Sequence, residues 1–164
     1  MGLPDMLPLP VAAAEARLQY WDGTSRRVYF TDSEVPFPEG RLIVSRTDLQ
    51  GIITHANDAF VEMSGYTREE LIGAPHNILR HPDMPRLAFK GLWDTLTSGQ
   101  KWHGYVKNLR KDGAHYWVYA TAVPNVRNGV IAGYTSVRRK PSRTRIAELS
   151  ALYAQWLQEE KAAP

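Results

Sequence analysis

The sequence predicts an α+β fold, in which strands at both ends of a patterned region flank a group of helices. Two β-branched runs within 41–58 open this region, and three runs rich in aromatic and β-branched residues between 101 and 140 close it. The stretch from 57 to 99 instead carries helix-capping residues and apolar side chains at helical spacing. Such a separation of strand runs from helix runs is typical of the α+β class.

The first 38 residues are predicted to be an N-terminal extension with a short helix. A proline-rich start is followed by the alanine-rich stretch PVAAAEARLQYW (10–21), whose composition favours helix. The prolines of VPFPEG (35–40) mark the entry into a domain. We therefore expect the domain itself to span residues 39–140.

The domain opens with a predicted hairpin and two short helices. Residues 48–51, Asp-Leu-Gln-Gly, separate the two β-branched runs and are suited to a turn. Asn57 or Asp58 is placed to cap the first helix, and Thr67 with Glu70 has the spacing of a capping box for the second.

A longer helix and three strands complete the predicted domain. PRLAFKGLWDTLTSG (85–99) spaces its leucines at helical intervals and ends at a glycine. The strand runs that follow are divided by Asp112-Gly113 and by Asn128-Gly129. These dipeptides supply the positive φ angles that tight hairpin turns require, so the three strands should be antiparallel neighbours.

Residues 141–164 are predicted to form a C-terminal signalling or linker helix. Ile146, Leu149, Tyr153 and Trp156 follow one another at alternating three- and four-residue steps, which gives a narrow, coiled-coil-like seam. A helix that packs on its own domain usually has a wider apolar stripe, but a seam of two turns fits both arrangements. With the alanine-rich stretch near the N-terminus, this seam predicts a homodimer formed through the terminal segments.

Composition and charge limit the classes of function. Of 164 residues, 43% are hydrophobic and 23% charged, as in soluble globular domains. The net charge of +3 gives no strong case for nucleic-acid binding, and the basic run 138–145 lacks interleaved aromatic residues. The absence of cysteine excludes disulfides, thiolate metal sites and cysteine nucleophiles.

Neither a membrane-spanning segment nor a catalytic motif is present in the sequence. No apolar run approaches the ~20 residues that cross a bilayer, and the start lacks the basic region of a signal peptide. The serines stand in no nucleophile-elbow context, and no phosphate-binding glycine loop occurs. We expect a cytoplasmic, non-enzymatic protein, or the cytoplasmic part of a membrane-anchored receptor that touches a membrane only indirectly.

The segment HNILRHPDMPRLA (76–88) crowds charged residues and two prolines into a short, rigid stretch. Arg80 and His81 offer the cationic and donor groups that a phosphate binds, and Asp83 can orient Arg80 or accept from a ribose. An Arg80–Asp83 ion pair that merely closes a loop explains the same residues. On chemistry alone the ion pair is the preferred interpretation.

Two longer stretches add a resemblance to a known family. ITHANDAFVEMSGYTREELIGAPHNILRHPDMP and GLWDTLTSGQKWHGYVKNLRKDGAHYWVYATAVPNVRNGVIAGYTSVR resemble the PAS sensor domain of bacterial aerotaxis receptors, from about Pro38 to Arg139. RHPDMP together with KN-x-R-K-x-G-x-x-Y-W is the selective part of the match. The resemblance implies a PAS fold, with a five-stranded antiparallel sheet and short helices on one face. It also implies non-covalently bound FAD that reports cellular redox state or oxygen availability to a signalling module in the same or a partner chain.

The resemblance carries a set of cofactor-binding residues with it: Asn57, Arg80, His81, Asp83, Trp93, Asn108 and Trp117. Arg80 would meet the pyrophosphate, Trp93 would stack on a ring, and Asn108 would pair with the polar edge of the flavin. Asn57 is also explained as a helix cap, Trp93 as plain core, and Trp117 as cross-strand packing.

Two alternatives to a flavin remain. PAS domains also bind haem through one histidine, and His76, His81, His103 and His115 are candidate axial ligands. His76 and His81 lie just before the longer helix, where such a ligand is usual in oxygen-sensing relatives. A PAS module that binds no cofactor and only contacts other proteins is the third possibility.

Overall fold

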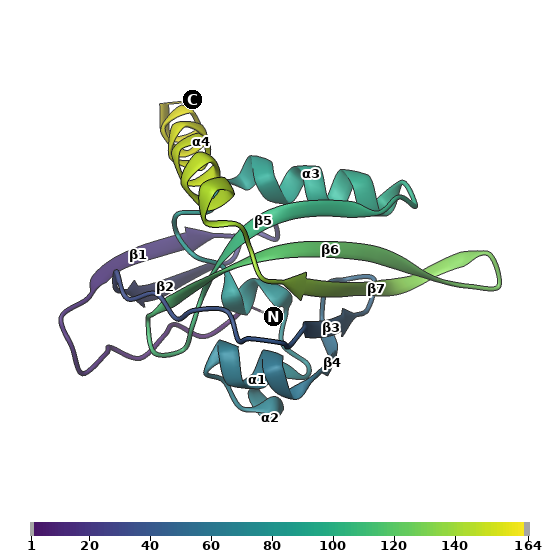
Figure 1. Cartoon of the computed structure of the whole chain (residues 1–164), viewed down its shortest axis with the longest axis horizontal. Coiled ribbons are helices and arrows are strands. Elements are labelled where there is room, and N and C mark those ends of the chain that lie inside the picture. The colour runs from purple at the N-terminus through teal and green to yellow at the C-terminus, as the bar shows by residue number, and fades with distance from the viewer. Residues whose placement is uncertain (1, 163–164) are drawn as a thin grey trace.

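A five-stranded antiparallel sheet is the centre of the computed structural model, which describes residues 2–162 (Figure 1). Its strand order, β4-β3-β7-β6-β5, places the first hairpin of the sheet beside the last strand. The strands are β3 (Ile43–Thr47), β4 (Ile53–Ala56), β5 (Trp102–Leu109), β6 (His115–Arg127) and β7 (Val130–Arg139). The predicted α+β class and antiparallel sheet are confirmed.

The segments between β4 and β5 cover one face of this sheet. They are α1 (Asp58–Ser64), α2 (Arg68–Leu71), the 3-10 helix η1 (His76–Leu79) and α3 (Arg86–Thr97). Phe60 of α1 and Leu79 of η1 are buried in one cluster with Ile43 and Tyr116 of the sheet, and Leu96 of α3 is buried in a second cluster. Burial of each such side chain contributes about 1.5–3 kcal/mol, so this inner face holds the domain together.

Local signals in the sequence form as predicted. The Asn57 Oδ1 accepts a hydrogen bond from the Phe60 amide at 3.0 Å, and Thr67 with Glu70 forms both bonds of a capping box. Asn128 and Gly129 turn β6 into β7 with φ angles of 52° and 78°. Both angles are positive, as a two-residue hairpin turn requires.

The predicted N-terminal helix is wrong, because the alanine-rich stretch forms a strand. β1 (Ala14–Gln19) pairs antiparallel with β2 (Ser25–Phe30) in a separate two-stranded sheet. Every second residue packs inward, so Leu18 of β1 and Val28 of β2 are buried with Leu109 of the main sheet. This packing outweighs the weak helix propensity of alanine.

The N-terminal hairpin is bonded to the rest of the molecule through Arg26. Its Nε donates to the carbonyl oxygen of Pro4 at 2.8 Å, its Nη1 to that of Ile78 at 3.1 Å, and its Nη2 to the Tyr66 hydroxyl at 3.2 Å. This buried cation is therefore hydrogen-bonded on three sides. It fixes the hairpin against η1, which lines the cavity described below.

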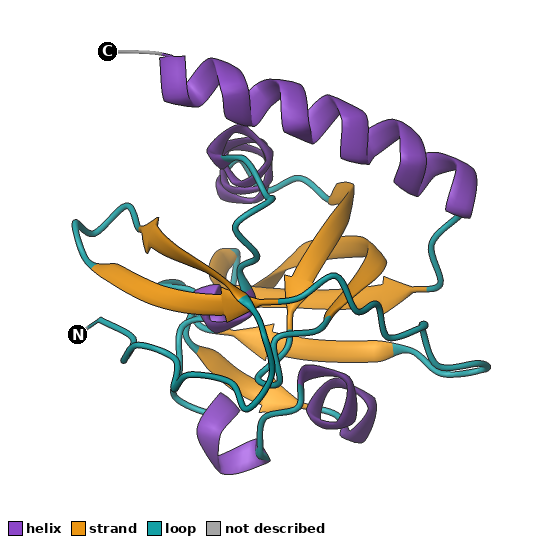
Figure 2. Ribbon diagram, turned by 90° about the vertical axis from the view of Figure 1, so that its left-hand side faces the viewer, coloured by secondary structure: helices purple, strands orange, loops and turns teal. Residues whose placement is uncertain are grey.

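The C-terminal helix α4 (Arg143–Ala162) packs on its own domain, where it lies across α3 (Figure 2). Ile146 and Tyr153 are buried against Met84 and Trp117, and the Tyr153 hydroxyl donates to the Tyr105 carbonyl oxygen at 2.7 Å. The apolar seam is thus used within the chain, which removes it as the basis for the expected dimer. No helix in residues 2–162 has the length and apolar character needed to cross a membrane.

We predict that Tyr153→Ala lowers the free energy of unfolding by roughly 3–5 kcal/mol, as other truncations of large buried aromatic residues do. Tyr153 is 5% exposed and its ring stacks on Trp117. Leu152→Ala, at a position 36% exposed, is the matched control. Urea unfolding measures both, and equal losses for the two variants would show that α4 does not dock through this face.

Candidate functional site

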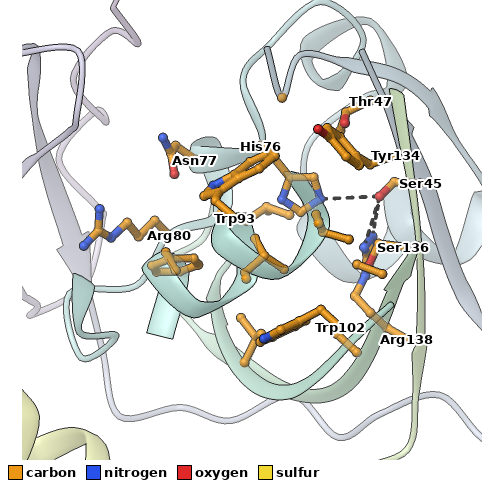
Figure 3. A pocket seen from close by; sticks show the side chains of 18 of the residues that line it. Ser45, Thr47, His76, Asn77, Arg80, Trp93, Trp102, Tyr134, Ser136 and Arg138 are labelled. Atoms are coloured by element: carbon orange, nitrogen blue, oxygen red, sulfur yellow. Dashed lines mark hydrogen bonds between the residues drawn. The ribbon is translucent and has the colours of Figure 1, made fainter. Parts of the chain in front are cut away.

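A cavity lies between the inner face of the sheet and the helical segments η1 and α3 (Figure 3). Strand alternation selects its lining, because residues two apart on a strand share a face. Val106 and Asn108 of β5 therefore both line the cavity. Its apolar and aromatic wall comprises Leu79, Phe89, Leu92, Trp93, Leu96, Trp102, Val106, Ala120, Ala122 and Tyr134.

Arg138 places an unpaired positive charge at one end of the cavity. It is 2% exposed, and its Nη1 and Nη2 donate to the Ser45 hydroxyl oxygen at 3.0 and 2.8 Å. Its guanidinium lies 4.7 Å from the centre of the Phe60 ring. The Arg138 Nε is buried without a hydrogen-bond partner, and no described Asp or Glu lines the cavity. Burial lowers the pKa of Arg138 to about 10, so it stays charged at neutral pH.

His76 stands beside Arg138 as a neutral side chain. Burial and the charge of Arg138 lower the pKa of His76 to about 3. Its Nε2 lies 3.4 Å from the Ser45 hydroxyl, and its ring stacks on Phe60 at 5.8 Å between centroids. Because the Ser45 oxygen accepts from Arg138, its hydrogen is directed to His76. The imidazole is thus held as a hydrogen-bonding group, not as a second cation.

Arg80 lies at the other end of the cavity, with Trp93 between it and Arg138 (Figure 3). It is 7% exposed, and its guanidinium lies 4.9 Å from the centre of the Phe89 ring. Within residues 2–162 its side chain makes neither a hydrogen bond nor a salt bridge, and its Nε is buried. Burial is the largest of the causes that lower the pKa of Arg80.

Three of the predicted binding residues meet at this cavity: Arg80, Trp93 and Asn108. Arg80 and Asn108 also face each other through an isolated β-bridge. Asn108 is 4% exposed, and the Trp93 ring meets Tyr134 edge-on at 5.4 Å between centroids. A flat aromatic wall, a buried amide and two arginines are therefore brought together.

Asn57 lies outside the cavity and acts as a structural cap. Besides capping α1, its Oδ1 accepts from the Val44 amide at 3.1 Å and its Nδ2 donates to the Leu42 carbonyl oxygen at 2.9 Å. These bonds join α1 to β3 and occupy both ends of the amide. The helix-cap interpretation accounts for its contacts.

His81 and Asp83 also face away from the cavity, although they follow Arg80 directly. The His81 ring contacts the rings of Phe30 and His115, at 5.3 and 5.9 Å between centroids. Asp83 pairs with Lys107 at 2.7 Å. The expected Arg80–Asp83 ion pair is therefore not the interaction that closes this segment. Together the two residues fix RHPDMP to β5 and β6.

Trp117 lies on the outer face of the sheet. Its neighbours on β6, Tyr116 and Val118, are buried in the inner cluster, so alternation turns Trp117 outward. There its ring stacks on Tyr153 of α4, with 6.4 Å between centroids. The packing interpretation of Trp117 describes its environment in this structure.

Ser45 and Arg138 are two of the polar lining residues that the sequence patterns did not identify; the others are Thr47, Asn77, Thr135 and Ser136. In the sequence, Arg138 is one member of the basic run 138–145. The phase of β7 is the signal that finds it, because Tyr134, Ser136 and Arg138 share one face and all line the cavity. Of the histidines considered as haem ligands, His76 reaches this cavity. Residues 2–162 hold no cluster of three or more His, Asp or Glu suited to a metal ion.

Comparison with known proteins gives this architecture a family. A model of the PAS fold matches residues 53–138. The aerotaxis receptor of Escherichia coli K12 is 52% identical over 129 residues, which are 79% of this chain and 26% of the receptor. The chain spans about a quarter of the length of the curated relatives it matches.

Solved structures agree with the family match. The PAS domain of a protein from Colwellia psychrerythraea has a TM-score of 0.52 at 29% identity, over 62% of this chain and 87% of that one. A light-oxygen-voltage domain studied with a flavin analogue has a TM-score of 0.56 at 21% identity, over 73% and 84%. Sequence and fold lead to one assignment: this chain belongs to the PAS family.

Proposed function

We propose that the chain is a PAS sensor domain that binds FAD non-covalently and reports cellular redox state or oxygen availability. The observation that carries the proposal is the pair of buried arginines, Arg80 and Arg138, at opposite ends of a cavity lined by no described acidic residue. A buried charge without a counter-ion is costly, so the cavity favours a ligand with electron-rich groups at both ends.

The lining residues fit the parts of a flavin dinucleotide. Trp93 and Trp102 provide flat apolar surfaces for ring faces, and the buried amide of Asn108 can pair with the polar edge of the isoalloxazine. Arg138 would face the electron-rich edge of the ring. Arg80, at the other end, would bind the pyrophosphate through charge-assisted hydrogen bonds.

A bound flavin supplies electron transfer, and it gains negative charge when it is reduced. Arg138 would stabilise that charge, because its own charge is buried and meets no carboxylate in the cavity. Asn108 would re-pair with the altered polar edge, since an unmatched buried polar group costs ~1–3 kcal/mol. Both side chains therefore make the protein respond to the redox state of the ring.

The response has a short path to the C-terminal helix. Arg138 is the penultimate residue of β7, and α4 begins at Arg143 after a short linker. We propose that residues 39–140 form the sensor unit and that 141–164 pass its state to a signalling module in the same or a partner chain.

We also propose that the protein forms a homodimer, through a surface other than the α4 seam. We further propose a cytoplasmic location and no catalytic turnover. His81, Asp83, Asn57 and Trp117 would support the site by holding its walls.

Haem is the second candidate, because the neutral imidazole of His76 reaches the cavity. A neutral imidazole is the form that ligates iron. The two buried arginines, Arg80 and Arg138, favour a flavin over haem. Identification of the released cofactor distinguishes the two candidates.

We predict that heating the purified protein releases FAD. The two arginines provide for a ring end and a phosphate end, and the resemblance of the RHPDMP segment to the aerotaxis sensor domain implies the dinucleotide. Chromatography of the supernatant identifies the cofactor. Recovery of FMN or haem alone would reject the FAD assignment.

Arg80→Ala should weaken FAD binding roughly ten- to hundredfold, which corresponds to the ~1.5–3 kcal/mol of a hydrogen bond to a charged group. The fold should persist, because Arg80 forms no ion pair in the described chain. Titration of the cofactor-free protein with FAD measures the affinity, with Arg127→Ala, at the exposed end of β6, as control. Wild-type affinity in Arg80→Ala would identify RHPDMP as a purely structural loop.

Arg138→Gln should lower the reduction potential of the bound flavin by roughly 30–60 mV for a two-electron couple, since about 1.5–3 kcal/mol of charge stabilisation is lost. Asn108→Ala should keep the cofactor and also shift its potential. Potentiometric titration followed by absorbance measures both variants. An unchanged potential in both would place the ring elsewhere.

A further inference from the structure

The first turn of α3 is capped by a residue from the far end of the chain. α3 follows Pro85, which provides no side-chain cap. Instead, the Arg86 and Leu87 amides donate to the two carboxylate oxygens of Glu160, each at 3.1 Å. A helix leaves its first amides without partners and carries partial positive charge there, so a carboxylate is favoured at this end. Glu160 of α4 thus supplies the cap that the local sequence lacks.

The capped turn also holds one end of the cavity. Phe89 lies one turn into α3, lines the cavity, and carries the Arg80 guanidinium over its ring at 4.9 Å. Burial lowers the pKa of Arg80, while the Glu160 carboxylate acts to raise it and the charge of Arg86 to lower it. Glu160 and Arg80 therefore interact electrostatically across the same turn of α3.

The part of α4 that bears Glu160 contains no buried residue. Ile146 and Tyr153 are the buried residues of the helix, and both precede the last two turns. Beyond Tyr153, Trp156 is half-buried, and Glu160 makes the hydrogen bonds that link these last turns to α3. A change of charge near the start of α3 would therefore act directly on the last two turns of α4.

We propose that Glu160 is a positioning residue that couples the end of α4 to the anion-binding end of the cavity. An anionic group bound at Arg80 repels the Glu160 carboxylate and weakens its contact with α3. By thermodynamic reciprocity, the docked carboxylate weakens binding of the anion by the same factor. A second observation indicates that an anion binds at this end: the Arg80 Nε is buried without a hydrogen-bond partner.

This inference rests on the proposed function, because it assigns the Arg80 end to the pyrophosphate of FAD. It adds a second route for the signal. The ring end acts on α4 through Arg138 and β7, whereas the phosphate end acts on the last turns of α4 through α3. The redox state of the cofactor would then act on the start of α4, and the occupancy of the site would act on its last turns.

The test compares Glu160→Gln with Glu159→Gln in the full chain. Glu160→Gln removes the charge and keeps one acceptor oxygen for the cap. Glu159 is the control, because its hydrogen bond is made to Gln155 on the same helix. We expect Glu160→Gln to bind FAD roughly two- to fivefold more tightly, within the range of a charge near a helix terminus. Riboflavin, which lacks the phosphates, should bind both variants and the wild type equally.

Hydrogen exchange of the Leu87 amide gives a readout that does not depend on FAD. Inorganic pyrophosphate should speed this exchange in the wild type and leave it unchanged in Arg80→Ala. If pyrophosphate speeds exchange but FAD does not bind, the coupling stands and the proposed function fails. Unchanged or weaker FAD binding by Glu160→Gln overturns the coupling, as does Leu87 exchange that responds to neither ligand.

Discussion

The contact between Arg138 and Ser45 is the constraint on which the site depends. It joins β7 to β3 through two hydrogen bonds of 3.0 and 2.8 Å, between residues 93 positions apart in the chain. Both side chains are buried, and the Phe60 ring lies against the guanidinium. A neutral hydroxyl and a ring face offset only part of the cost of removing a cation from water. The sheet thus carries a fixed charge into an apolar cavity.

The surrounding residues hold the Arg138 side chain in place and provide no counter-ion for its charge. Ser45 is also bonded to His76, which burial and Arg138 itself hold in the neutral state. Arg80 adds a second unpaired cation at the other end of the cavity. A ligand that binds the folded state and supplies electron-rich groups to both would stabilise the fold by mass action. We therefore expect the free energy of unfolding to increase as more of the protein binds cofactor.

Much of the fold could be predicted, because its signals are local. The Asn128-Gly129 turn and the Thr67–Glu70 capping box each depend on residues that are close in sequence, and each forms as expected. The N-terminal hairpin could not be predicted in the same way. Its strand state depends on burial of Leu18 and Val28 against Leu109, a contact between distant parts of the chain. Propensity alone therefore favoured the wrong structure.

The site was predictable only in part, for a related reason. Arg80, Trp93 and Asn108 came from motif resemblance, and the structure brings them to one cavity. Arg138 looked like one member of a basic run, since nothing next to it in sequence shows that β7 turns it inward. The opposite error concerns Trp117. The resemblance implied that it binds the cofactor, but its position on β6 turns it to the outer face of the sheet, where it packs against α4. In each case the outcome depends on which face of the sheet the side chain lies on, and that face is set by strand pairing across the sheet.

The visible absorption spectrum of the protein as purified tests the central claim most directly. A cavity built around two unpaired buried arginines should retain its flavin through purification, which predicts the paired absorption bands of an oxidised flavin. A single intense Soret band would show that His76 ligates haem instead. A colourless protein that also fails to bind added FAD would contradict the account, because Arg138 would then be balanced by something other than a cofactor.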